Sequence, residues 1–247
     1  MRRRRRGLPI EGAAIIARHL AVWPLLDEQE QQRLLHIAGE LLARKRWEAA
    51  RGFELDDTMR VVIAAQAALL VLGLTSDQYG QVSGIVVHPT TVVTTGVRPG
   101  PSPGTVTSDP QAVLGLAQDR HGPVVLAWDQ ALAGAHREQP GHNVVLHEFA
   151  HKLDMLDGSI DGTPLLPRGL RADWVRVCTD VYDDLVAGRP RPPMRWYGAT
   201  NPGEFFAVAT EVFFEQSHEL AGYEPELYDV LARFYRQDPA AREASAG

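Results

Sequence analysis

Residues 147–151 read His-Glu-Phe-Ala-His, with two histidines four positions apart and a glutamate directly after the first. Residues at this spacing lie on one face of an α-helix, one turn apart, so both imidazoles can reach a single tetrahedral zinc ion. Glu148 can then reach a metal-bound water rather than the metal, which suits a general base. The pattern predicts a hydrolytic zinc site. The alternative is an ordinary amphipathic helix that carries two polar histidines.

A catalytic zinc ion usually has three protein ligands, so a third ligand must lie elsewhere. Asp157 has the spacing of metzincin-like sites, but those sites need a glycine at position 154 to turn the chain sharply, and this chain has Asp154 there. Asp154 follows His151 by three residues on the same helix face. We expect it to accept a hydrogen bond that orients an imidazole, the alternative being a solvent-exposed carboxylate.

Two glutamates on a later predicted helix are further candidates for the third ligand. Glu204 and Glu211 are seven residues apart and therefore lie on one helix face. A glutamate from a second helix would complete a gluzincin-like site. Glu204 also fits a capping box, with Asn201 as the N-cap residue and Pro202 at the first helical position. Spacing alone does not choose between Glu204 and Glu211.

The elements that must position these residues follow from periodicity and from turn residues. Apolar residues at helical spacing alternate with short β-branched runs that are bounded by Gly and Pro. Predicted helices cover residues 13–51, 59–74, 143–154, 169–187, 202–215 and 224–236, and predicted strands cover 85–87, 90–95 and 123–128. The proline-rich segment 98–110 is expected to be a loop.

This order of elements predicts an α+β fold, with a mostly helical single domain around a small central β-sheet. Residues 1–12, which include the run Arg2 to Arg6, are expected to form a basic, disordered tail. Residues 13–240 would form the domain. Its predicted parts are a helical part at 13–80, a sheet region at 82–128 and a zinc-binding helical part at 140–240.

Composition limits the classes of protein that fit. The formal net charge of -6 gives no global indication of nucleic-acid binding, so none is expected. Cys178 is the single cysteine, which excludes an internal disulfide and fits a reducing compartment. The longest apolar stretch, residues 61–74, is interrupted by Gln66 and is too short to span a bilayer. The start does not read as a signal peptide. We expect a cytoplasmic protein without a membrane span.

Longer motifs around these residues resemble a known family. Residues 147–154 read HEFAHKLD and residues 201–208 read NPGEFFAV, with further matching strings at 52–55 and 234–239. Over about residues 20 to 239 the chain resembles the MtfA family (Mlc titration factor A) of zinc-dependent peptidases. This resemblance implies a cytosolic zinc peptidase with aminopeptidase activity, acting on a peptide substrate. It also implies a catalytic core similar to that of anthrax lethal factor.

The resemblance also implies roles for individual residues. It gives His147, His151 and Glu204 as the ligands of one Zn²⁺ per chain, and so selects Glu204 over Glu211. Tyr197, seven residues before Glu204, is implied as a site residue that could stabilise an oxyanion. A second function follows from the same family, that of a regulatory binding protein which sequesters a transcriptional repressor. In such a binding protein the zinc site would serve a structural purpose, and a structural zinc site has four protein ligands.

Overall fold

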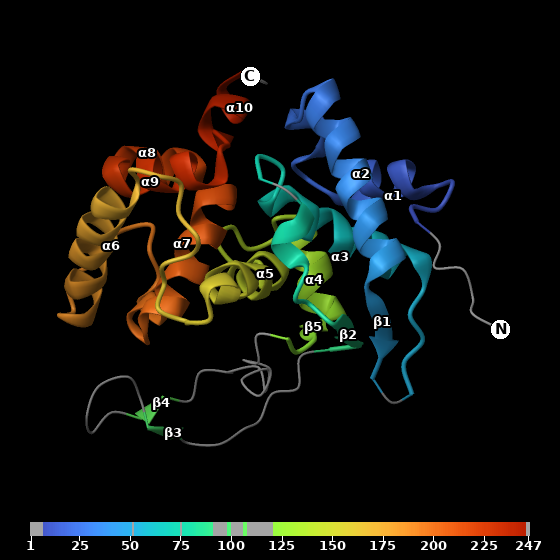
Figure 1. Cartoon of the computed structure of the whole chain (residues 1–247), viewed down its shortest axis with the longest axis horizontal. Coiled ribbons are helices and arrows are strands. Elements are labelled where there is room, and N and C mark those ends of the chain that lie inside the picture. Colours follow the sequence, from blue (N-terminus) through green and yellow to red (C-terminus); the bar gives the residue numbers. More distant parts are fainter. Residues whose placement is uncertain are drawn as a thin grey trace.

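A computed structural model of the chain describes residues 7–50, 52–74, 76–90, 98–99, 106–107 and 121–245 (Figure 1). The helices are α1 (Gly12–His19), α2 (Glu28–Arg44), α3 (Asp57–Leu70), α4 (Trp128–Ala135), α5 (Val144–Asp154), α6 (Arg171–Val186), α7 (Pro202–Glu215), α8 (Ser217–Tyr223), α9 (Pro225–Tyr235) and α10 (Pro239–Ser245). Short 3-10 helices are η1 (Trp23–Leu25), η2 (Ser76–Tyr79), η3 (Met155–Asp157) and η4 (Trp196–Ala199).

A three-stranded parallel sheet lies within this helical framework. Its order is β1 (Arg46–Ala49), β2 (Gly84–His88) and β5 (Val124–Ala127), with β2 in the centre. Helix α3 provides the crossover between β1 and β2, as a parallel pair requires. The apolar, β-branched sequences of β2 and β5 fit strands that are largely buried. The predicted α+β class, mostly helical with a small central sheet, is confirmed.

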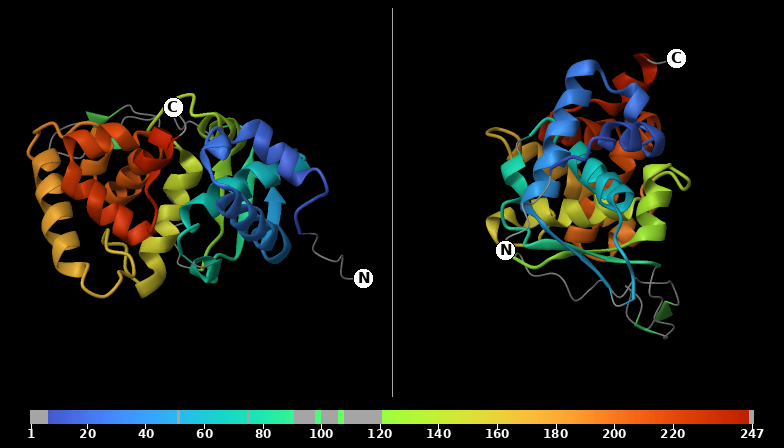
Figure 2. Two further views of the ribbon diagram at one scale, coloured as in Figure 1. Left: turned by 90° about the horizontal axis from the view of Figure 1, so that it is seen from above. Right: turned by 90° about the vertical axis from the view of Figure 1, so that its right-hand side faces the viewer.

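Helix α5 lies between the two halves of the molecule. It packs against α3 on one side and against α7 on the other. The N-terminal helices and the C-terminal helices lie at opposite ends, with α5 between them (Figures 1 and 2). Helices α3 and α7 are apolar on almost every face, and the residues Val61–Leu70 and Gly203–Glu215 are buried throughout. Such helices belong in a core, so α5 is held between two rigid supports.

The prediction of continuous helix over residues 13–51 is wrong. The chain instead forms α1, η1, α2 and then β1. Asp27 starts α2 with a capping box that includes Glu30, so the helix cannot run through this point. After Lys45 the chain becomes extended because β1 pairs with β2, and this partner lies about 40 residues away along the sequence.

Other segments differ from expectation or lie outside the described residues. Helices α4, α8 and α10 were not predicted, because each is short and carries little periodicity. Within the expected loop 98–110, β3 (Arg98–Pro99) and β4 (Val106–Thr107) form an antiparallel pair. The rest of that segment, most of the predicted strand 90–95 and the Arg2 to Arg6 run lie outside the described residues. No described helix is long and apolar enough to cross a membrane.

Gly73 tests the packing between the two halves of the fold. A Cβ atom there would lie 2.3 Å from the carbonyl oxygen of Tyr235 and 2.6 Å from that of Arg236, both of which are backbone atoms. Gly73→Ala should therefore lower the free energy of unfolding by about 1–3 kcal/mol in urea denaturation. Gly222→Ala is the matched control, because its added methyl group meets open space beyond the backbone of its own helix and its chain neighbours. Equal stability of the two variants would contradict this packing.

Candidate metal centre

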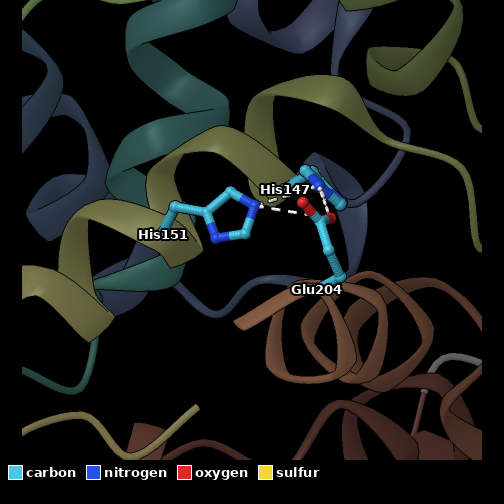
Figure 3. Close-up of side chains that lie close together, drawn as sticks. All are labelled: His147, His151 and Glu204. Atoms are coloured by element: carbon cyan, nitrogen blue, oxygen red, sulfur yellow. Dashed lines mark hydrogen bonds and ion pairs between the residues drawn. The ribbon is translucent and has the colours of Figure 1, made fainter. Parts of the chain in front are cut away.

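Three side chains from two helices converge on one point (Figure 3). His147 and His151 come from α5, and Glu204 comes from α7. The Nε2 atom of His147 lies 3.2 Å from His151 Nε2 and 3.0 Å from Glu204 Oε2. His151 Nε2 lies 3.6 Å from the same carboxylate oxygen. All three side chains are largely buried.

These separations fit a common metal ion. Ligand atoms about 2 Å from a tetrahedral zinc ion lie about 3.3 Å from one another, and the three observed distances fall on either side of that value. Two imidazoles with one carboxylate form a donor set that is typical of catalytic zinc sites. Among the described residues, no other group of three potential ligands converges in this way.

Asparagine caps fix the start of both helices. Asn143 Oδ1 accepts hydrogen bonds from the backbone N–H groups of Val145 and Leu146, each at 3.1 Å, and so begins α5. Asn201 Oδ1 accepts from the N–H of Glu204 at 3.0 Å and begins α7, with Pro202 in the first turn as predicted. The Glu204 carboxylate points to the two imidazoles (Figure 3). The cap therefore places Glu204 through its backbone and leaves its side chain for the cluster.

Glu211 lies on the other side of the same imidazole. Its Oε1 atom is 2.8 Å from His147 Nδ1, whereas Glu204 approaches His147 Nε2. Because the two glutamates are two helical turns apart on α7, they contact opposite nitrogen atoms of one ring. A carboxylate on Nδ1 holds the proton there and leaves Nε2 to face the cluster. The structure thus places Glu204, and not Glu211, with the converging donor atoms.

The expected contact between Asp154 and an imidazole does not form. Asp154 is fully buried, and its Oδ2 atom accepts a hydrogen bond from the N–H of Gly162 at 3.0 Å. Its Oδ1 atom and the Nδ1 atom of His151 are both buried without a hydrogen-bond partner. Burial raises the pKa of Asp154 to about 6. Asp154 therefore holds the chain after η3 in place instead of orienting a ring.

Asp157 does not belong to the group of converging donor atoms. It is exposed, and its Oδ1 atom accepts hydrogen bonds from the backbone N–H and the hydroxyl of Ser159. The chain turns at Gly158, which has a φ of 102°. This left-handed turn comes four residues after position 154, where a metzincin-like site would need it, so Asp157 stays at the surface.

Glu148 and Tyr197 both lie beside the cluster. Burial raises the pKa of Glu148, although the neighbouring charges of His147 and His151 lower it in part. Tyr197 is half-buried in η4, and its ring centroid lies 6.0 Å from that of His147. Helix η4 packs against α7, so the segment that carries Tyr197 runs past the start of the Glu204 helix.

The charges of the cluster are coupled. Burial by itself would lower the pKa of His147, but hydrogen bonds to Glu204 and Glu211 outweigh this effect and raise it to about 10. Burial likewise opposes ionisation of Glu204, yet its contacts with His147 and His151 hold the pKa of this carboxyl well below its usual range. A cation that binds here therefore displaces a proton from His147, and its affinity depends on pH.

Several polar residues that support the site were not identified from the sequence. Asn143 Nδ2 donates to Glu215 Oε1 at 2.8 Å and to Gln66 Oε1 at 3.0 Å, which links α5 to α7 and to α3. Burial raises the pKa of Glu215 to about 7. The position of Asn143 just before the helix was a capping signal, and Glu215 follows Glu211 by one turn on the same face. Arg195, which contacts Glu211, gave no signal of this kind.

A helical α+β domain with a His-Glu-x-x-His helix and a glutamate on a second helix is the arrangement of a metallopeptidase. The chain matches the model of the family described as glucose-regulated metallo-peptidase M90 over residues 1–236, and it belongs to that family. This membership confirms the resemblance to the MtfA family that the motifs indicated.

Three relatives show the extent of the similarity. The uncharacterized protein slr2042 of Synechocystis is 38% identical over 95% of this chain and 86% of its own length. Mlc titration factor A of Serratia proteamaculans is 35% identical over 88% of this chain and 84% of its length. Mlc titration factor A of Yersinia pestis is 33% identical over 88% of this chain and 81% of its own length. The similarity therefore extends over the whole fold and not over the site alone.

The cap of α5 can be tested separately from the cluster. Asn143→Ala removes the cap and leaves the buried partners on α3 and α7 without their donor. We expect the free energy of unfolding to fall by about 1–3 kcal/mol and the affinity for zinc to fall as well, because the first turn of α5 carries His147. Denaturant unfolding of the metal-free protein and zinc titration measure the two effects.

Asp27→Ala is the control for this experiment. Asp27 caps α2 in the same manner, with the N–H of Glu30 at 2.8 Å, but α2 contributes no residue to the cluster. This variant should lose about 1 kcal/mol of stability and bind zinc as the wild type does. Equal zinc affinity in both variants would show that the α5 cap does not support the site.

Proposed function

We propose that the protein is a zinc-dependent peptidase in which His147, His151 and Glu204 hold the metal ion. The observation that carries this proposal is the convergence of three buried donor atoms from α5 and α7. Membership of a metallopeptidase family supports it. Two imidazole nitrogens and one carboxylate oxygen suit zinc by their chemistry, whereas calcium and magnesium prefer oxygen ligands alone.

Glu148 is the proposed general base. Bound zinc supplies a Lewis acid that polarises a carbonyl group and makes water a stronger nucleophile near neutral pH. With zinc held there, the Glu148 carboxylate would accept a proton from the attacking water and would return it to the leaving amine as the peptide bond breaks. Its pKa is raised by burial, and a base with a raised pKa accepts a proton more readily. The same carboxylate thus acts first as a base and then as an acid.

Tyr197 is the proposed donor to the oxyanion that forms during attack on the carbonyl. Its ring lies beside that of His147, and η4 holds it near the start of the Glu204 helix. A neutral phenol can donate a hydrogen bond to a developing negative charge without competing as a strong metal ligand. With Glu148, it would place one proton acceptor and one hydrogen-bond donor around the reacting carbonyl.

The type of peptidase activity and the cellular location are proposed from the family. We propose aminopeptidase activity on peptide substrates and a cytoplasmic location, which the single cysteine fits. Two of the relatives carry the name Mlc titration factor A, which favours a second candidate function, the binding of a transcriptional repressor. A site with three protein donors is typical of catalysis, whereas structural zinc sites have four. This count favours the peptidase.

The first test combines metal removal with loss of the base. Zinc-loaded wild type should hydrolyse members of a panel of aminoacyl and peptide substrates, and chelation should abolish this activity. Glu148→Gln should keep about one zinc per chain and the fold but lose hydrolysis by about 100-fold or more, because the amide cannot accept the proton. Elemental analysis and steady-state kinetics are the measurements. A variant with wild-type turnover would remove Glu148 from the mechanism.

A second test separates the ligand choices. Glu204→Ala should weaken zinc binding by about 100-fold or more, since it removes a donor atom from the cluster. Asp157→Ala should bind zinc as the wild type does, because Asp157 is exposed and contacts Ser159. The Asn201 cap binds the backbone of residue 204 and remains in the variant, so circular dichroism should show an intact α7. Unchanged zinc affinity in Glu204→Ala would exclude it as a ligand.

A further inference from the structure

Arg195 joins three segments that surround the metal centre. Its Nη2 atom donates to Glu211 Oε1 at 2.5 Å, and its Nη1 atom lies 3.0 Å from Nδ1 of His142, in the turn before α5. Its own carbonyl oxygen accepts from the N–H of Gly198 at 3.0 Å and so begins η4. Arg195 therefore contacts Glu211 of α7, the turn before α5 and the first turn of η4, which carries Tyr197.

The contact with Glu211 leads directly to His147. The same carboxylate oxygen, Oε1, receives the hydrogen bond from Arg195 Nη2 and lies 2.8 Å from His147 Nδ1. The other oxygen of Glu211 accepts from the N–H of Asn143 at 2.5 Å. The position of the guanidinium group thus fixes the oxygen that orients the imidazole. A planar guanidinium can hold two partners at once, which a lysine ammonium does less precisely.

We infer that Arg195 is a positioning residue that holds the His147 imidazole in place through Glu211. Its side chain acts on the proposed metal ligand through Glu211, and its backbone carbonyl separately begins η4, the segment that carries Tyr197. Replacement of the Arg195 side chain therefore disturbs the imidazole and leaves the backbone bond that begins η4 in place. This inference rests on the proposed function, because it assigns Arg195 to the same site.

The burial of Arg195 supports a positioning role. Only 24% of its side chain is exposed, and its Nε atom is buried without a hydrogen-bond partner. The geometry is therefore set by the two Nη contacts.

Arg191 provides a matched control four residues earlier in the same segment. Its side chain is also 24% exposed, and it pairs with carboxylates of Asp184 and Glu224. The hydrogen bonds and ion pairs found for it are to carboxylates outside the cluster, and Glu211 is not among them. Loss of Arg191 therefore removes an arginine of equal exposure and leaves the contact between Glu211 and His147 in place.

The first measurement concerns the metal environment. Arg195→Ala, Arg195→Lys and Arg191→Ala are loaded with Co²⁺, whose absorption spectrum reports the ligand geometry, and zinc release to a chelator is timed. Both Arg195 variants should show an altered spectrum and release zinc about 10- to 100-fold faster than wild type. Arg191→Ala should match wild type. If Arg195→Lys has the spectrum and release rate of wild type, positive charge alone suffices and the inference is overturned.

The second measurement concerns turnover. Arg195→Ala should lower kcat by about 10- to 100-fold with little change in KM, since it displaces groups that act during the reaction. In the double variant with Glu211→Gln, the loss should be smaller than the product of the two single losses, because Arg195 acts on His147 through the Glu211 carboxylate. Multiplicative losses, or equal kcat for Arg195→Ala and Arg191→Ala, would overturn the inference. Absence of zinc-dependent hydrolysis in the wild type would instead refute the proposed function.

Circular dichroism and thermal unfolding establish that each variant is folded. Arg195→Lys keeps a cation beside Glu211, so it provides the test if Arg195→Ala does not fold. The spectrum of the Co²⁺ form does not depend on substrate choice. This measurement therefore tests whether Arg195 positions His147 even when the peptide substrate is a poor one.

Discussion

The packing of α5 against α7 is the interaction on which the candidate metal centre depends. Each helix alone carries polar side chains along a face that is otherwise buried. Only when the two faces meet does His147 lie between Glu204 at one nitrogen and Glu211 at the other. Buried charges without partners are costly, so each helix requires the other to satisfy its polar groups. The site and the core are therefore formed by the same contact.

The apolar surroundings determine how strongly these charges interact. Helix α3 supports α5 from the side opposite α7, and both supporting helices are buried along their length. In such an environment hydrogen bonds and ion pairs are stronger than in water. This is why the pKa of His147 is raised and that of Glu204 is lowered although burial opposes both charges. The same setting favours the binding of a dication, which can take the place of the proton.

The polar residues around the centre form one connected structure. Asn143 begins α5 and also contacts Glu211 and Glu215 of α7, so the start of one helix is fixed by the side chains of the other. Arg195 adds the η4 segment to this arrangement through Glu211. Metal ligands are held precisely when the groups behind them are fixed in this way. The membership of a metallopeptidase family is consistent with a site built for such precision.

The sequence by itself determined the elements whose signals are local. The four-residue spacing of His147 and His151 set two imidazoles on one face of α5, and Asn201 with Pro202 marked the start of α7. Strands β2 and β5 followed from their β-branched runs. Helical periodicity, capping and strand propensity depend on neighbours within a few residues, so they can be read without knowledge of the fold.

Only the tertiary structure decided which polar groups meet. Spacing left Glu204 and Glu211 equivalent, and their different places appear once α7 faces α5. Asp154 pairs with the backbone of Gly162 and not with an imidazole, because the chain after η3 returns to it. Strand β1 and the role of Arg195 likewise depend on distant partners. A buried polar group takes its partner from whatever packs against it, and that choice is made by the whole fold.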